Sequence, residues 1–233
     1  AQMPKDKIAL QGEDSFKAEM FKEFSDTIED NALYVATTGS DSNAGTIDKP
    51  FATVQKALDT VKAGQTIYVR GGTYNALNSF KTSGSEGKYI TLRNYPNETP
   101  FLTCTTGTNG AILLLNGCNY IKIYGLEIGG HSAEQAYGIL INDCENHIII
   151  SNNHIHNLLT TKPGENGEAN GILLFGEGKT DETSINNICI ENNNIHNNTT
   201  GWSETLSTSG NCKYVNVINN TVHDNTNIGI DFY

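Results

Sequence analysis

The chain has 233 residues, 37% hydrophobic and 18% charged, a balance typical of a soluble globular protein with one sizeable core. The formal net charge of -11 argues against nucleic acid as a partner, because a polyanion would be repelled without a basic patch. No apolar run is long enough for a transmembrane helix, so no membrane span is expected.

The first 31 residues differ from the rest and are predicted to form a helical extension. Apolar side chains recur there at helical spacing among Lys, Glu and Asp: Phe16, Met20, Phe21, Phe24 and Ile28. This pattern is typical of an amphipathic helix. We expect the helix to pack against the domain formed by residues 32–233.

A second, shorter helix is predicted after the strand-like residues 33–36 and the turn-rich residues 37–49. Pro50 stands where a helix would begin, and Gly64 follows its end. Its apolar stripe consists of Phe51, Val54, Ala57, Leu58 and Val61. Such a helix would cap the open N-terminal end of a solenoid core.

One short phrase returns four times in the second half of the chain, at residues 123–129, 150–156, 190–196 and 217–223. Its β-branched residues alternate with strand period, and in three copies an Asn pair interrupts them where a tight turn is needed. A second strand phrase precedes the turn by fourteen residues in three of the coils. Two β phrases per repeat, stacked at this period, predict an all-β fold, a parallel β-helix.

The Asn pairs have a further consequence in such a solenoid. Asn153, Asn193 and Asn220 would lie one above another at about 4.8 Å, where their amides can bond along the stack. The Ile, Val and Leu residues of each coil would be buried only against neighbouring coils, as one continuous aliphatic column.

Three stretches near the N-terminus carry a specific resemblance. Residues 34–46, residues 49–58 (Lys-Pro-Phe-Ala-Thr-Val-Gln-Lys-Ala-Leu) and residues 64–74 (Gly-Gln-Thr-Ile-Tyr-Val-Arg-Gly-Gly-Thr-Tyr) resemble the opening of pectate-lyase-like right-handed parallel β-helix proteins. The resemblance implies a right-handed β-helix that acts on carbohydrate, most often on polyuronates.

The resemblance also implies a mechanism, β-elimination. A cation neutralises the uronate carboxyl group, and a Lys or Arg abstracts the neighbouring proton. In family-nine pectate lyases Asp residues bind calcium and a Lys is the base, but no Asp cluster with a following Lys occurs here. Lys213 is the nearest basic residue in the register. The polygalacturonase pattern of Asn-Thr-Asp, an Asp pair and Gly-His-Gly is missing as well.

Long segments between repeats indicate where a binding groove would lie. They span residues 129–137, 157–170 and 197–204, always between the turn and the next strand phrase. Insertions on one face of a solenoid commonly wall a groove. The outward row of the adjoining strands is predicted to change from apolar to polar, in the order Leu113, Leu140, Leu173, Ser207 and Asp231.

Several groups able to act on a sugar gather at the polar end of this row. Glu204 and Asp231 are the predicted catalytic carboxylates, with Asp224 and Asp231 as calcium ligands. The predicted substrate contacts are Trp202, which could stack on a sugar ring, and Ser207, Asn211 and His223. Each also has a structural interpretation: loop packing for Trp202, a solvated carboxylate or strand cap for Glu204, and a turn-closing side chain for Asp224.

The recurring histidines and the cysteines are interpreted structurally. His156, His196 and His223 share one repeat position and are expected to stack as a polar ladder. The five cysteines form no zinc pattern. Cys118 and Cys144 fall on adjacent coils and could form a disulfide, although buried thiols are the favoured interpretation.

The overall expectation is a secreted or cell-surface polysaccharide lyase of bacterial type, assisted by calcium. Ala1-Gln2 would be a reasonable mature start after removal of a leader. A glycoside hydrolase with paired carboxylates and a non-catalytic binding or structural protein remain as alternatives. The chain stops at Tyr233 inside a strand phrase, so a missing C-terminal segment or a second chain is expected to cover the solenoid end.

Overall fold

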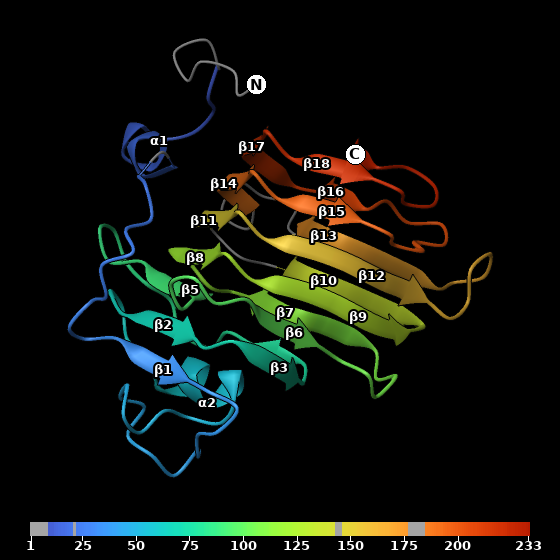
Figure 1. Ribbon diagram of the computed structural model, residues 1–233. Coiled ribbons are helices and arrows are strands. Elements are labelled where there is room, and N and C mark those ends of the chain that lie inside the picture. Colours follow the sequence, from blue (N-terminus) through green and yellow to red (C-terminus); the bar gives the residue numbers. More distant parts are fainter. Residues whose placement is uncertain (1–8, 21, 143–145, 177–184) are drawn as a thin grey trace.

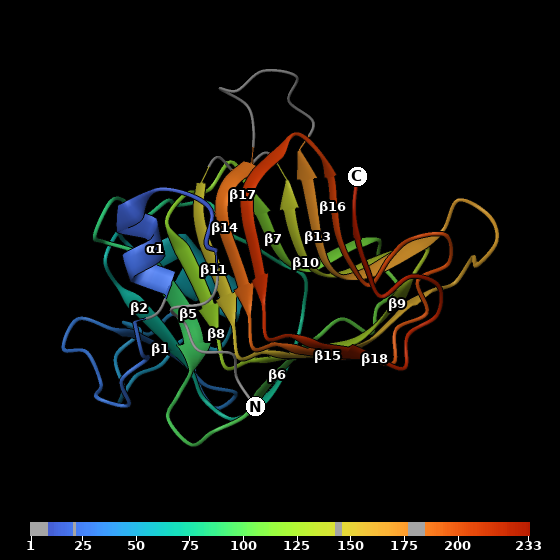
Figure 2. The same ribbon diagram turned by 90° about the horizontal axis from the view of Figure 1, so that it is seen from above.

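Three parallel sheets run the length of the molecule, and successive coils of the chain add strands to each (Figure 1). The structure is a computed structural model that describes residues 9–20, 22–142, 146–176 and 185–233. Seen along the stack, the sheets enclose a common interior (Figure 2). This architecture is a parallel β-helix, as the repeats predict.

Each complete coil contributes one strand to sheet 1, then sheet 2, then sheet 3. In spatial order, sheet 1 consists of β1 (Leu33–Val35), β2 (Thr66–Val69), β5 (Ile90–Asn94), β8 (Ile121–Tyr124), β11 (Asn146–Ser151), β14 (Ile185–Glu191) and β17 (Cys212–Ile218). Sheet 2 consists of β3 (Gly72–Asn75), β6 (Pro100–Thr103), β9 (Glu127–Ala133), β12 (His154–Thr160), β15 (Asn194–His196) and β18 (Thr221–His223). Sheet 3 consists of β4 (Asn78–Ser79), β7 (Gly110–Asn116), β10 (Gln135–Asn142), β13 (Glu168–Gly176), β16 (Leu206–Gly210) and β19 (Ile230–Phe232).

The interior is a column of aliphatic side chains in register. On sheet 1 one row of Cα partners consists of Ile67, Leu92, Ile123, Ile150, Ile190 and Val217. The first five of these side chains are fully buried. Alternate residues of a strand face opposite sides, so the neighbouring positions are left to interact with whatever covers the sheet from outside.

The turns between sheets 1 and 2 carry a hydrogen-bonded stack of Asn side chains. Asn153 Nδ2 donates to Asn193 Oδ1 at 3.0 Å, and Asn193 Nδ2 donates to Asn220 Oδ1 at 2.9 Å. The preceding residue of each turn has a left-handed backbone, with φ of 57° at Asn152 and 55° at Asn192. Asn tolerates this conformation better than most residues, which explains its recurrence there.

A short helix covers the N-terminal end of the column. Helix α2 (Val54–Thr60) is capped by the Thr53 side chain, and it buries Val54, Ala57 and Leu58 in the main core. The helix expected after Pro50 is therefore present, but it begins three residues after Phe51. No helix in the described residues is long and apolar enough to cross a bilayer.

The N-terminal extension differs from its prediction. Helix α1 ends at Met20 (Asp14–Met20), and Phe24 and Ile28 lie in a non-helical segment that crosses the outside of sheet 1. Phe21 lies outside the described residues. Phe16 and Met20 are buried on Ile149, Cys189 and Ile218. The apolar spacing found the buried positions, but packing on a sheet does not require one continuous helix.

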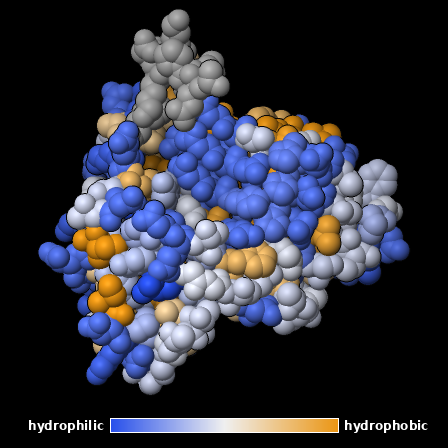
Figure 3. All heavy atoms as spheres, in the orientation of Figure 1, coloured by the Kyte–Doolittle hydropathy of each residue, from blue (hydrophilic) through white to orange (hydrophobic). Residues whose placement is uncertain are grey.

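The outer face of sheet 2 has a different character. Hydrophilic side chains gather over β12, β15 and β18 (Figure 3). This face includes the histidines whose recurrence is visible in the sequence. His156, His196 and His223 stack, with ring centroids 5.5 Å and 4.9 Å apart.

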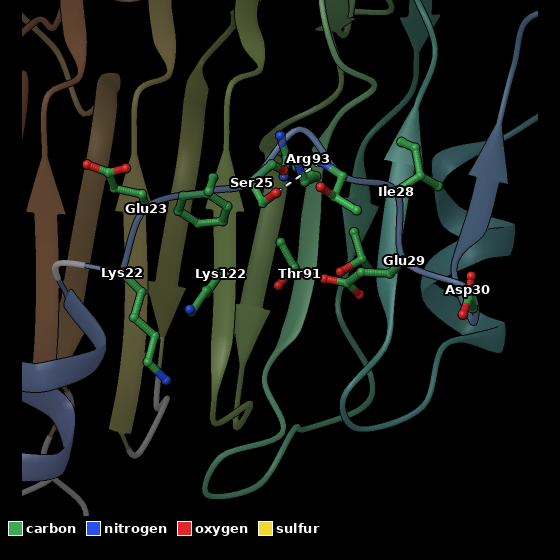
Figure 4. A pocket seen from close by; sticks show the side chains of 12 residues that line it. Lys22, Glu23, Ser25, Ile28, Glu29, Asp30, Thr91, Arg93 and Lys122 are labelled. Carbon is green, nitrogen blue, oxygen red and sulfur yellow. Dashed lines mark hydrogen bonds between the residues drawn. The ribbon is translucent and has the colours of Figure 1, made fainter.

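Two buried cations attach the extension to sheet 1. Arg93, which is 4% exposed, donates to the carbonyl oxygen of Ser25 at 2.8 Å (Figure 4), and Lys122 pairs with Glu19. Arg93 also lies over Phe24, 5.5 Å from the ring centroid. The hollow of about 590 Å³ between segment 22–30 and the sheet is therefore lined by cations that the extension already engages.

Candidate functional site

An acidic hollow opens beside sheet 3, where the segments that follow β12 and β15 project. Its volume is about 520 Å³, and its lining consists of Glu165, Asn166, Gly167, Glu168, Trp202, Ser203, Glu204 and Tyr233. Trp202 is 70% exposed, so its indole offers a flat apolar surface to solvent. The insertions expected on one side thus place the Trp202 indole and three carboxylates, Glu165, Glu168 and Glu204, around one hollow.

Glu168 is fixed in this hollow by hydrogen bonds. The Tyr137 hydroxyl donates to Glu168 Oε1, and Ser203 Oγ donates to Glu168 Oε2 at 3.3 Å. Burial, together with the neighbouring Glu168 carboxylate, raises the pKa of Tyr137, which keeps its hydroxyl protonated. Glu168 therefore accepts two hydrogen bonds from protein, one of them from Ser203, the residue next to Trp202.

Glu204 and Asp231 are both neighbours of Ser207. Ser207 Oγ donates to Glu204 Oε2 at 3.4 Å, and Ser207 is the Cα partner of Asp231 on the next strand. Glu204 and Asp231 are both half-buried. The Ser207 side chain itself is fully buried, so it orients Glu204 and does not contact substrate as the sequence prediction has it.

The outward row of sheet 3 begins one residue later than predicted. Leu114 pairs with Leu140, whereas Leu113 pairs with Ile139 and lies fully buried in the main core. The prediction for Leu113 is wrong because residues 111–115 are all apolar, and a run without alternation does not define which residues face inward. The rest of the predicted row, Leu140, Leu173, Ser207 and Asp231, is confirmed by the pairing.

The remaining predicted site residues lie away from the hollow. Asn211 follows β16 at the opposite end from Glu204, and its backbone bonds to Gly176 and Ile185. His223 and Asp224 belong to the outer face of sheet 2 and to the turn after it. His223 Nδ1 lies 2.7 Å from Asp224 Oδ2. The sequence cluster is thus divided, because neighbouring coil positions belong to different sheets.

Asp224 has a structural explanation of its own. Its φ of 52° matches the left-handed backbone at Gly130, Asn157 and Asn197, which occupy the same turn in the preceding coils. Among the residues that the structure describes, three carboxylate, His or Cys ligand atoms gather only at Glu127, His154 and His156. Neither Asp224 nor Asp231 belongs to this group, and calcium binding by these two carboxylates stays a prediction.

Sequence reasoning missed Glu165, Glu168 and Tyr233, which line the hollow, and Tyr137, which bonds to Glu168. Glu165 precedes β13 and Glu168 is its first residue, in a stretch without periodicity, so no pattern marks the orientation of either side chain. The alignment of Glu168 with Gln135 on β10 emerges only from the pairing. The possible Cys118–Cys144 disulfide involves a residue outside the described part of the chain.

Comparisons with known proteins agree with this architecture. Residues 33–233 match the family model for the Pel9A-like, right handed beta helix region. The uncharacterized protein YwoF of Bacillus subtilis is 37% identical over 207 residues, 85% of this chain and 43% of its own length. Pectate lyase PEL9 of Emericella nidulans is 29% identical over 164 residues, 61% of this chain and 38% of that protein. The chain thus spans less than half the length of these relatives.

Two solved structures share the fold. Pectate lyase Pel9A has a TM-score of 0.63 at 15% identity, covering 86% of this chain and 50% of its own. The GH136 lacto-N-biosidase from Eubacterium ramulus has a TM-score of 0.60 at 17% identity, covering 80% of this chain and 36% of its own. One neighbour is thus a lyase and the other a glycosidase. With a family match over nearly the whole β-helix, this chain belongs to the Pel9A-like right-handed β-helix family.

Proposed function

We propose that this protein is a polysaccharide lyase that cleaves a polyuronate by β-elimination beside sheet 3. The observation that carries the proposal is the hollow in which exposed Trp202 and half-buried Glu204 lie together, in a chain related to pectate lyase PEL9. The relationship supports the substrate class. The hollow supplies a surface for a sugar ring and a carboxylate within reach of it.

Glu204 is the proposed proton acceptor. It would take the proton from the carbon next to the uronate carboxyl group, and the electron pair would form a carbon–carbon double bond. The glycosidic C–O bond would break, and the leaving oxygen would take a proton from water. Ser207 orients Glu204, Asp231 lies beside Ser207 on the next strand, and Trp202 would stack on the sugar.

Because the hollow is acidic, an anionic substrate needs a cation in order to bind there. Glu165, Glu168 and Glu204 would repel a uronate carboxylate unless a cation lies between them. Calcium is the ion we propose, supplied with the polymer. Secretion is part of the same proposal, because a polyuronate substrate would be met outside the cell.

The test incubates the protein with pectate, alginate and glycosaminoglycans, with calcium or with a chelator. β-Elimination yields an unsaturated uronide that absorbs in the near ultraviolet, and we expect this signal on one polymer, lost with chelator. Glu204→Gln should lower turnover by at least about 100-fold, within the range for loss of a general base. Asp48→Asn is the matched control, because Asp48 is an exposed carboxylate in the turn-rich region before α2.

Hydrolysis is the second candidate, favoured by the placement of two carboxylates next to Ser207: Glu204 accepts its hydrogen bond, and Asp231 is its Cα partner on the next strand. It would produce reducing ends without the ultraviolet signal, and Asp231→Asn would then abolish activity together with Glu204→Gln. Binding to a polymer without either product, with affinity retained in both variants, would identify a non-catalytic binder and contradict both enzymatic proposals.

A further inference from the structure

A carboxylate and several imidazoles converge on the outer face of sheet 2, away from the sheet 3 hollow. Glu127 and His154 are Cα partners on adjacent strands, and His156 lies two residues beyond His154 on the same face. Ile128 and Ile155, between these positions, are fully buried in the core. The alternation of each strand therefore directs all three polar side chains outward.

The distances within this group suit a single metal ion. His156 Nε2 lies 2.9 Å from Glu127 Oε1, and one ligand atom each of Glu127, His154 and His156 lies within 4.8 Å of the other two. Four ligands at about 2.0–2.1 Å around a tetrahedral zinc ion lie about 3.4 Å from one another. Small side-chain rotations would bring the observed atoms to that spacing.

The hydrogen bonds around His154 leave it a nitrogen for a metal. His196 Nδ1 lies 2.9 Å from Asn197 Oδ1, an oxygen that only accepts, so Nδ1 carries the hydrogen and His196 Nε2 is an acceptor. His154 Nε2 lies 2.6 Å from that acceptor and donates to it. His154 Nδ1 is then the nitrogen with the lone pair, oriented by an outer hydrogen bond as metal-binding histidines usually are.

The surroundings of the group allow entry of an ion and hold one of its rings in place. The side chains of His156 and Glu127 are 13% and 28% exposed. The ring of His156 is also stacked against Phe101, with centroids 5.8 Å apart, which limits its rotation.

We propose that Glu127, His154 and His156 bind one transition-metal ion of the Zn²⁺ class on the outer face of sheet 2. Two imidazoles and a carboxylate are a donor set that zinc prefers, and three protein ligands leave a coordination position for water. His196 is a positioning residue that orients His154. His223 belongs to the ring stack but not to the site, because Asp224 and Asn194 engage its two ring nitrogens.

The test is calorimetric titration of the metal-free full chain with Zn²⁺. We expect one ion per chain, with affinity lowered by at least about 100-fold in Glu127→Gln and His156→Gln and by about 10- to 100-fold in His196→Gln. The control is His147→Asn, because His147 lies on sheet 1 with φ of 63° and Asn187 occupies the corresponding position of the next strand with φ of 53°. This variant should bind as the parent protein does.

Absorption of the Co²⁺-loaded protein in the visible range gives a second readout, because a tetrahedral site has a characteristic strong band that Glu127→Gln should remove. Thermal unfolding without metal shows whether each variant folds. Gln at position 127 keeps the side-chain length and an acceptor for His156, so this variant remains informative if a histidine variant fails to fold. Absence of stoichiometric binding by the parent protein, or full affinity in folded Glu127→Gln and His156→Gln, would overturn the proposal.

Discussion

Sheets 1 and 3 share one aliphatic interior, yet their outer faces are used differently. Outside sheet 1, Arg93 binds the chain's own segment 22–30, Lys122 pairs with Glu19 of α1, and Phe16 and Met20 bury Ile149. Outside sheet 3, a row of leucines changes to Ser207 and Asp231 beside an acidic hollow. The inward positions therefore specify the β-helix, and the outward positions decide what each face contacts.

The inner column should tolerate change least. Ile150→Ala removes a fully buried side chain between Ile123 and Ile190 and is expected to lower the free energy of unfolding by about 2–5 kcal/mol. Leu140→Ala on the outer row of sheet 3 should cost less than half as much, because Leu140 is only half-buried. Denaturant unfolding of both variants measures the difference, and equal losses would contradict the separation of inner and outer roles.

Substitution in the Asn stack between sheets 1 and 2 should cause the second-largest loss of stability. Asn193→Ala removes the acceptor of the Asn153 backbone N–H and side-chain amide and the donor to Asn220, so we expect a loss of about 1–3 kcal/mol. Asn152→Gly is the control, since glycine adopts the left-handed backbone at that turn position. Its stability should change by less than that of Asn193→Ala in the same unfolding experiment.

Segment 22–30, which covers sheet 1, can be destabilised without changing the core. Arg93→Met keeps the side-chain length but removes the bond to Ser25 and the interaction with Phe24, at a cost of about 1–2 kcal/mol. Limited proteolysis followed by mass spectrometry should show faster cleavage within residues 22–32. The exposed Lys62→Met serves as control, and an unchanged cleavage rate in Arg93→Met would show that the aromatic contacts suffice.

The smallest expected effect is a pH dependence at Glu19. Partial burial acts to raise the pKa of Glu19, but Lys122 and Lys22 outweigh burial and place it below the usual 4.5. A lowered folded-state pKa gives stability that is present above about pH 4.5 and is lost as the pH falls through the folded value. Glu19→Gln should remove about 1 kcal/mol or less of acid-sensitive stability, seen as a flatter stability profile below that pH.

The sequence predicts the fold more fully than the site for a physical reason. Core burial and turn chemistry repeat in every coil. The Asn turns and the alternating Ile and Val residues therefore indicate the same β-helix in several independent copies. Apolar spacing predicts that Phe16 and Met20 are buried, but it does not predict where the helix ends, because the sheet surface and not helical propensity shapes segment 22–30. Leu113 was misplaced by one residue where alternation is lost.

Site residues carry no such repetition. Glu168 and Tyr137 meet across adjacent strands, and Glu127 meets His154 in the same way, so both pairs depend on the strand register. His154 stands two residues before His156, and on a strand this spacing places both imidazoles on one face, so this part of the group can be predicted from the sequence. Glu127 could be added only by aligning the coils at Gly125 and Asn152, which share the left-handed turn position.

The stacked amides of Asn153, Asn193 and Asn220 also set where this molecule can change in length. A coil that enters sheet 2 with an extra residue at this corner would lose its bonds to the coils above and below. Residues 163–166, between β12 and β13, are not part of this amide stack and project beyond the sheets (Figure 2). The corner therefore fixes the length of the coil, and a foreign loop grafted at 163–166 could alter the hollow while the solenoid keeps its register.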